Sequence, residues 1–106
     1  MGDLKIRRDQ PDKWLTILRL KGEFEGLAVL NAKEELLGYL KEAMGTDFIM
    51  DLGEIEYIDS AGVGILLEMA KMASEKRMKF GLVNVHEPVK KVLAVTKVNE
   101  VLKIYE

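Results

Sequence analysis

The chain has 106 residues, of which 48% are hydrophobic, so it suits one compact domain with a single core. Its 16 Lys and Arg residues and 18 Asp and Glu residues leave a formal net charge of -2, with both signs scattered along the chain. This pattern gives no basic stretch for direct nucleic-acid binding. The absence of cysteine and the single histidine, His86, exclude thiol nucleophiles, disulfide frameworks and paired-histidine metal sites. We therefore expect one domain over residues 1–106, with no metal and no cofactor.

Nothing in the sequence predicts membrane insertion. The longest apolar run, residues 61–67, is far shorter than the roughly 20 residues that span a bilayer. Gly2 could begin a myristoylation signal, but Ile6 stands where that signal needs Ser or Thr, and no signal peptide follows. A cytoplasmic location is the expectation.

The first half of the chain predicts a hairpin followed by a helix. Residues 4–8 alternate weakly, residues 9–12 have turn composition, and residues 14–20 are rich in large and branched side chains. An exposed loop is expected at residues 23–25. Apolar residues at 32, 36, 40 and 43 then predict a helix within residues 28–44, which begins near Ala28 or is capped by Asn31.

The second half alternates strands with helices. Residues 48–52 suit a strand covered on both faces, and residues 60–76 suit a mostly buried helix. A strand at 79–85, a helix opened by Pro88 and a strand at 101–105 complete the order β-β-α-β-α-β-α-β. This order predicts a small α/β sandwich. We expect a mixed, mostly parallel sheet with an antiparallel N-terminal hairpin and about three helices packed on it.

The segment from Ile58 to Gly64 is the most informative, because a short acidic stretch passes there into a helix. Ser60 is placed to cap that helix, whose first backbone N–H groups lack internal partners. Gly62 and Gly64 fall in the first turn, where each costs about 1 kcal/mol relative to alanine. A helix start with two glycines indicates close approach by a sheet, a phosphate or a partner protein.

Four interpretations of this segment are open. In the simplest, Asp59 and Ser60 only cap a buried helix. A nucleophile elbow fits poorly, because Ile58 stands where the elbow needs glycine and only His86 could act as the base. A nucleotide-binding turn lacks its third glycine and the lysine of a P-loop. The fourth interpretation is phosphorylation of Ser60.

Phosphorylation of Ser60 would act on a partner rather than on the fold. A phosphate adds a charge of about -1.5 to -2, which would take the net charge from -2 to roughly -4. A helix N-terminus tolerates that charge, since its dipole and free N–H groups favour anions. A docked partner would instead be excluded by bulk and by repulsion, particularly if Asp59, Glu56 and Glu25 cluster there.

The order of elements and the sequence of residues 59–64, Asp-Ser-Ala-Gly-Val-Gly, resemble the STAS domain family, in particular the stand-alone bacterial anti-sigma factor antagonists. Residues 18–25 resemble the family's second strand and the loop after it. Residues 48–52 resemble the strand before the switch serine, and residues 81–104 resemble the final strand, helix and strand. The resemblance covers residues 4–105.

The resemblance implies a binding protein in a partner-switching pathway of transcription regulation, and not an enzyme. Unphosphorylated family members bind an anti-sigma factor that is also a serine kinase with a histidine-kinase-like ATPase fold, which frees the sigma factor. Phosphorylation of the serine matching Ser60 releases the complex, and a PP2C-like phosphatase resets it. The residues implied to contact the partner are Glu25, Asp59, Ser60, Ala61, Gly62, Val63 and Gly64.

The resemblance also implies individual roles. Asp59 would orient the hydroxyl group or add to the repulsion once phosphate is present, and the two glycines would let the partner approach. Glu25 stands where the family commonly has aspartate, so its charge lies one methylene farther out. An alternative is a non-switching STAS adaptor subunit of a lipid or anion transport complex, which shares the fold without using the same partner.

Overall fold

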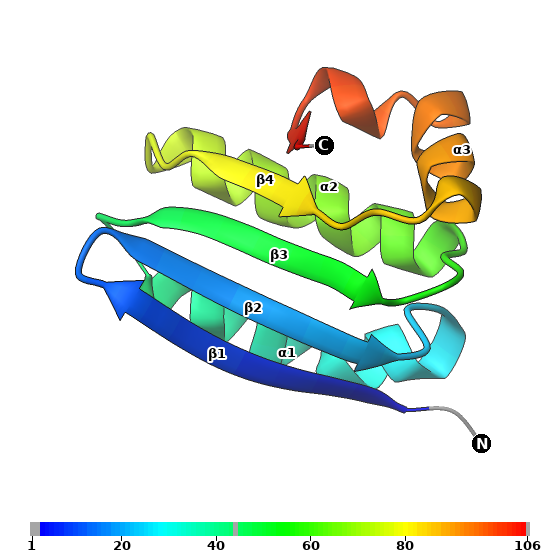
Figure 1. Ribbon diagram of the computed structural model, residues 1–106, viewed down its shortest axis with the longest axis horizontal. Coiled ribbons are helices and arrows are strands. Elements are labelled where there is room, and N and C mark those ends of the chain that lie inside the picture. The colour runs from blue at the N-terminus through cyan, green and yellow to red at the C-terminus, as the bar shows by residue number, and fades with distance from the viewer. Residues whose placement is uncertain (1–2, 44, 106) are drawn as a thin grey trace.

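The computed structural model describes residues 3–43 and 45–105 (Figure 1). Within these residues the chain forms five strands, three α-helices and one short 3-10 turn. In chain order they are β1 (Leu4–Asp12), β2 (Leu15–Gly22), α1 (Gly26–Glu42), β3 (Asp47–Glu54), α2 (Ser60–Glu75), β4 (Phe80–Val83), α3 (Glu87–Val95), the turn η1 (Val98–Glu100) and β5 (Lys103–Ile104).

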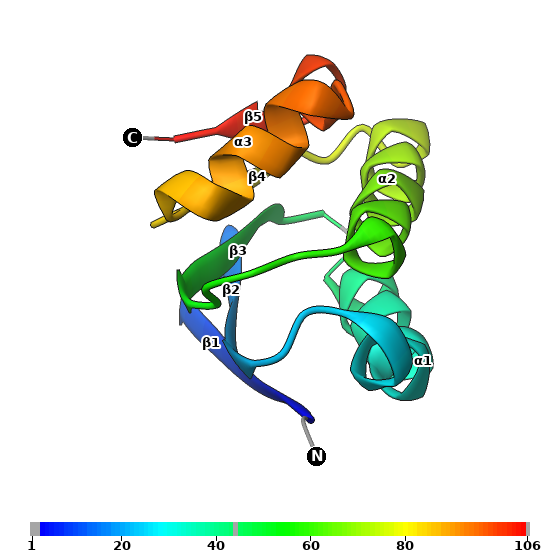
Figure 2. The same ribbon diagram turned by 90° about the vertical axis from the view of Figure 1, so that its right-hand side faces the viewer.

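The strands lie in the sheet in the order in which they occur in the chain, β1-β2-β3-β4-β5. β1 pairs with β2 antiparallel, and the later pairs are parallel. Right-handed crossovers from β2 to β3 and from β3 to β4 place α1 and α2 on one face of the sheet. Figure 2 shows α1 and α2 side by side on that face, while α3 lies near β4 and β5. The predicted α/β architecture is therefore confirmed.

The core lies between the sheet and the pair α1 and α2. Successive side chains of a strand point to opposite faces of the sheet, so only every second one enters this core. In β2, Leu18 and Leu20 are buried, whereas Arg19 between them is half-buried. The same alternation in β3 corrects the expectation of a strand covered on both faces. Phe48, Met50 and Leu52 face the helices, but no helix in the described part of the chain covers β1 to β3 on the opposite side (Figure 2). The helices supply Val29, Ala32, Leu36, Leu40, Ile65, Leu66 and Met69.

Two expectations on the path into α1 are wrong. The helix begins at Gly26, two residues before Ala28, and Asn31 lies inside it rather than at its cap. Phe24 is fully buried rather than part of an exposed loop, and its backbone forms a parallel bridge with Ile58. The buried Phe24 and its bridge to Ile58 thus connect the segment before α1 to the segment before α2.

The later elements follow their predictions closely. α2 starts at Ser60, and Pro88 lies in the first turn of α3 as expected. β4 and β5 are shorter than predicted, and residues 98–100 form the turn η1 before β5. No helix among the described residues has the length and apolar character needed to cross a bilayer.

Candidate functional site

Ser60 lies at the end of the sheet where β2 and β3 finish and α1 and α2 begin. The loop after β2 and the loop after β3 run beside each other, linked by the backbone bridge between Phe24 and Ile58. The two helices therefore start side by side, in the arrangement visible in Figure 1. A partner that reaches Ser60 meets both helix starts at once.

Asp59 joins these two helix starts through one carboxylate. Its Oδ1 accepts hydrogen bonds from the backbone N–H groups of Ala61 (3.0 Å) and Gly62 (3.1 Å). Its Oδ2 accepts a hydrogen bond from the N–H of Gly26, the first residue of α1, at 3.0 Å. Glu25, the residue before α1, makes no side-chain cap of its own. Asp59 thus caps α2 and supplies a side-chain acceptor to α1.

The structure corrects the prediction that Ser60 caps the helix. The extended backbone of Asp59 places its carboxylate over the first amides of α2, so the capping position is already taken. Ser60 is the first helical residue, it is exposed, and within the described residues its hydroxyl group has no hydrogen-bond partner. Asp59 therefore does not orient this hydroxyl by a hydrogen bond. Ser60 is therefore accessible from solvent.

The two glycines of the motif have different surroundings. A Cβ atom on Gly62 would lie 2.5 Å from the carbonyl oxygen of Phe24 and 2.6 Å from Cγ1 of Ile58. Gly62 is therefore needed for close packing between the two loops. A Cβ atom on Gly64 would meet nothing within 4 Å, and Gly64 is exposed. Only Gly64 leaves open space for a partner.

The predicted partner-contacting residues accordingly divide into two groups. Glu25, Asp59 and Ala61 are half-buried, and Ser60 and Gly64 are exposed, so all five reach the surface at one place. Gly62 and Val63 are buried and face the interior, where Val63 belongs to the core, and direct contact of these two residues with a partner stays a prediction.

An acidic groove of about 450 Å³ is formed by the ends of β2 and β3 and by the loops that lead from them to α1 and α2. Glu25 and Glu56, two of the three acidic residues whose clustering would add to the repulsion of a partner, both line it. Sequence reasoning missed Glu23 and Glu54, because their approach depends on how the ends of β2 and β3 are placed. Among the described residues, no group of His, Cys, Asp or Glu has an arrangement that could hold a metal ion. The complete lining is Gly22, Glu23, Glu25, Gly53, Glu54, Glu56 and Tyr57.

Exposed apolar side chains accompany the acidic groove. Leu27 and Leu30, in the first turns of α1, are 72% and 63% exposed, and Tyr57 is 58% exposed. Large apolar side chains with such exposure near a polar rim are typical of protein interaction surfaces. We call the residues Glu25, Leu27, Leu30, Tyr57, Ser60 and Gly64 the switch surface.

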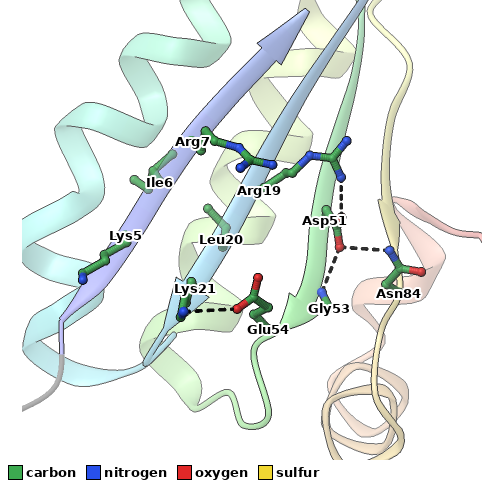
Figure 3. Close-up of a pocket in the computed structure, with 10 residues that line it drawn as sticks. All are labelled: Lys5, Ile6, Arg7, Arg19, Leu20, Lys21, Asp51, Gly53, Glu54 and Asn84. Carbon is green, nitrogen blue, oxygen red and sulfur yellow. Dashed lines mark hydrogen bonds and ion pairs between the residues drawn. The ribbon is translucent and has the colours of Figure 1, made fainter. Parts of the chain in front are cut away.

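A charged network on the helix-free face of the sheet supports the loop that leads to Ser60 (Figure 3). Arg19 donates from Nε to Asp9 at 2.6 Å and from Nη1 to Asp51 at 2.7 Å. The other oxygen of Asp51 accepts hydrogen bonds from the Gly53 N–H at 2.9 Å and from Nδ2 of Asn84 at 3.0 Å. These contacts join four successive strands or strand ends. They fix the end of β3 at Gly53, six residues before Asp59.

The network shifts the pKa values of its acidic members. Burial of Asp51 disfavours its charged form, but hydrogen bonds from Asn84, Gly53 and Arg19 outweigh burial and hold its pKa below the ordinary 3.8. The hydrogen bond from Arg19 likewise lowers the pKa of Asp9. His86 precedes α3 without capping it by its side chain, and its Nε2 lies 2.7 Å from the Gly53 carbonyl oxygen.

The lowered pKa of Asp51 predicts an acid-sensitive contribution to stability. A depressed carboxyl pKa stabilises the fold above the unfolded-state pKa of about 3.9, and this contribution is lost as the pH falls through the lower folded-state value. We expect urea unfolding from pH 7 to below pH 4 to show a smaller acid-induced loss of stability in Asp51→Asn than in the unmodified chain. Asp47→Asn is the control, because Asp47 is exposed on the same strand. An identical loss in all three chains would contradict the prediction.

Comparisons with known proteins were consistent with this geometry. The model of the STAS domain family matches residues 5–106. A protein of Thermotoga neapolitana, named "Putative anti-sigma factor antagonist TM1081 homolog", is 33% identical over 58 residues, which is 55% of this chain and 51% of that protein. The chain thus spans about half the length of the curated relatives it matches.

Solved structures share the fold over nearly the whole chain. The crystal structure of TM1081 from Thermotoga maritima, described as an anti-sigma factor antagonist of putative status, has a TM-score of 0.82 at 24% identity, covering 95% of this chain and 86% of that one. The anti-sigma factor antagonist SpoIIAA in its unphosphorylated form has a TM-score of 0.77 at 19% identity, covering 96% and 89%. Bacillus SpoIIAA in its phosphorylated form has a TM-score of 0.71 at 18% identity, covering 96% and 92%. Because the family model matches nearly every residue, this chain belongs to the STAS domain family.

Proposed function

We propose that this chain is an anti-sigma factor antagonist whose unphosphorylated form binds an anti-sigma factor serine kinase through the switch surface. The observation that carries the proposal is the exposed Ser60 hydroxyl, which has no hydrogen-bond partner among the described residues and lies at the start of α2. Relatives named as anti-sigma factor antagonists support it, as does a structural neighbour described in both unphosphorylated and phosphorylated forms.

Ser60 acts in this proposal as a substrate and the chain is not an enzyme. The kinase, with a histidine-kinase-like ATPase fold, transfers the γ-phosphoryl group of ATP to Ser60 Oγ. The bond between the γ-phosphorus and its bridging oxygen breaks, the new P–O bond forms, the hydroxyl proton passes to a base of the kinase, and ADP leaves. A PP2C-like phosphatase later hydrolyses the phosphoserine. The chain itself places no base within hydrogen-bond distance of Ser60 in its described part, so the chemistry belongs to the partners.

The switch surface suits recognition by a protein. Leu27, Leu30 and Tyr57 supply apolar contact area, and the acidic groove beside them favours a partner with basic side chains. Binding of the unphosphorylated chain to the kinase would release the sigma factor from the kinase. Phosphorylation would end binding through bulk and charge at the centre of the contact.

The proposal is tested by incubating the purified chain with the anti-sigma factor kinase of its source organism and ATP. We expect intact-mass measurement to show one added phosphate, absent from Ser60→Ala and retained by Ser74→Ala. Ser74 is the matched control because it is also exposed on α2, near the opposite end of the helix. Phosphate on Ser60→Ala would overturn the assignment of the site. Purification in complex with a transport ATPase or permease, with no binding to the kinase, would instead identify a transport adaptor.

A further inference from the structure

The Asp59 carboxylate occupies the hydrogen-bond donors that a phosphate on Ser60 would find nearest. Both amides that hold its Oδ1, those of Ala61 and Gly62, lie in the first turn of α2 directly after Ser60. Helix N-terminal amides attract anions in proportion to charge, and a phosphate carries about -1.5 to -2 with three acceptor oxygens. The phosphate would therefore compete successfully with the Asp59 carboxylate, of charge -1, for these amides, and it would also repel that carboxylate.

Displacement of Asp59 would also affect α1. The carboxylate cannot leave the α2 amides without changing its position relative to the Gly26 N–H, which it holds at 3.0 Å. No side-chain cap from Glu25 would replace that contact. Gly26 itself has φ +53°, a conformation that glycine adopts and leaves without a steric penalty, so its backbone can move once the contact is lost. Loss of the hydrogen bond between Gly26 and Asp59 would therefore affect the first turns of α1 most, and these turns carry Leu27 and Leu30.

Resting on the proposed function, we infer that Asp59 is a positioning residue that holds the start of α1 in its binding conformation, and that phosphate on Ser60 takes over the α2 amides and releases it. Phosphorylation then changes the apolar part of the switch surface, in addition to adding bulk and charge. The rearrangement is local, because the bridge between Phe24 and Ile58 and the packing of Gly62 against both continue to hold the loops together.

Amide hydrogen exchange tests the inference without a kinase. The chain is prepared with phosphoserine installed at position 60, and the exchange rates of Gly26, Ala61 and Gly62 are compared with those of the unmodified chain by NMR. We expect exchange at Gly26 to rise about five- to tenfold on phosphorylation, as expected for loss of one hydrogen bond, with Ala61 and Gly62 remaining protected by the phosphate. Unchanged exchange at Gly26 would overturn the inference.

Asp59→Asn separates the two contacts of the carboxylate. Asparagine caps helices about as well as aspartate, so its oxygen continues to accept from the α2 amides. Its NH₂ group then faces the Gly26 N–H, and two donors cannot bond each other. We expect Gly26 exchange in unphosphorylated Asp59→Asn to rise by the same factor, and phosphorylation of this variant to add no further increase at Gly26. An independent, additive increase would show that phosphate acts without Asp59 and would contradict the inference.

Failure of this inference is distinguishable from failure of the proposed function. A chain that no kinase phosphorylates can still show the exchange change when phosphoserine is installed directly. Conversely, the chain could be phosphorylated and lose its partner while exchange at Gly26 stays unchanged. That result would support the proposed function and contradict only the positioning role of Asp59.

Discussion

Ser60→Asp is expected to lower affinity for the anti-sigma factor kinase at least about 100-fold, which corresponds to about 2.7 kcal/mol of binding free energy. The substitution places a carboxylate in the exposed first turn of α2, beside a groove lined by four glutamates. In a partner contact, an added desolvated charge with no complement is costly. Isothermal titration calorimetry with the purified kinase measures the change.

The fold should survive this substitution. An acidic residue at a helix N-terminus is favourable or neutral, so the free energy of unfolding should change by less than about 0.5 kcal/mol. Ser74→Asp is the matched control: it adds the same charge to an exposed position of the same helix, away from the switch surface, and should leave affinity unchanged. Equal affinity of Ser60→Asp and Ser74→Asp would contradict exclusion at Ser60.

Gly62→Ala should destabilise the fold by about 2 to 4 kcal/mol, measured by urea unfolding. The added methyl group would lie 2.5 Å from the backbone oxygen of Phe24, which no rotamer change can move, and 2.6 Å from Cγ1 of Ile58. Relief requires the two loops to separate, and the bridge between Phe24 and Ile58 resists that movement. Kinase binding should weaken as well, since the same loops form the switch surface.

Gly64→Ala provides the comparison two residues away. Its Cβ would meet open space, so alanine should stabilise the helix by up to about 1 kcal/mol through its higher helix propensity. If Gly64→Ala were as destabilising as Gly62→Ala, the cost would reflect the helix start in general rather than the contact with Phe24.

Periodicity and motif spacing were sufficient to predict the order of elements and the position of Ser60. Large and branched side chains along residues 14–20 and the helical spacing that starts at residue 28 are local signals, and the chain forms β2 and α1 there. The bond between Asp59 and Gly26 could not be predicted in the same way, because it joins residues 33 apart through the relative placement of two loops. Sequence therefore placed Ser60 at the start of α2 and offered both Asp59 and Ser60 as caps, of which only Asp59 caps the helix.

The helix-free face of the sheet shows a second limit. Residues 48–52 include Ile49 between buried neighbours, and such a short apolar run favours a strand buried on both sides. The deciding factor is the order of the strands: the crossovers from β2 to β3 and from β3 to β4 both turn to the same side, which leaves Asp51 facing Arg19 and Asn84 rather than a helix. This information lies in the order of the strands and not in the strand's own sequence.

The sharing of one carboxylate by two helix starts also sets the local charge balance. Each helix N-terminus carries the equivalent of about +0.5 charge, so the starts of α1 and α2 together offer about +1, which the single charge of Asp59 cancels. With the Asp59 carboxylate in place this junction is nearly neutral, although four glutamates line the groove formed by the adjoining loops. A phosphate on Ser60 would move the junction to about -2, so a partner adapted to a neutral centre next to an acidic groove would meet negative charge throughout.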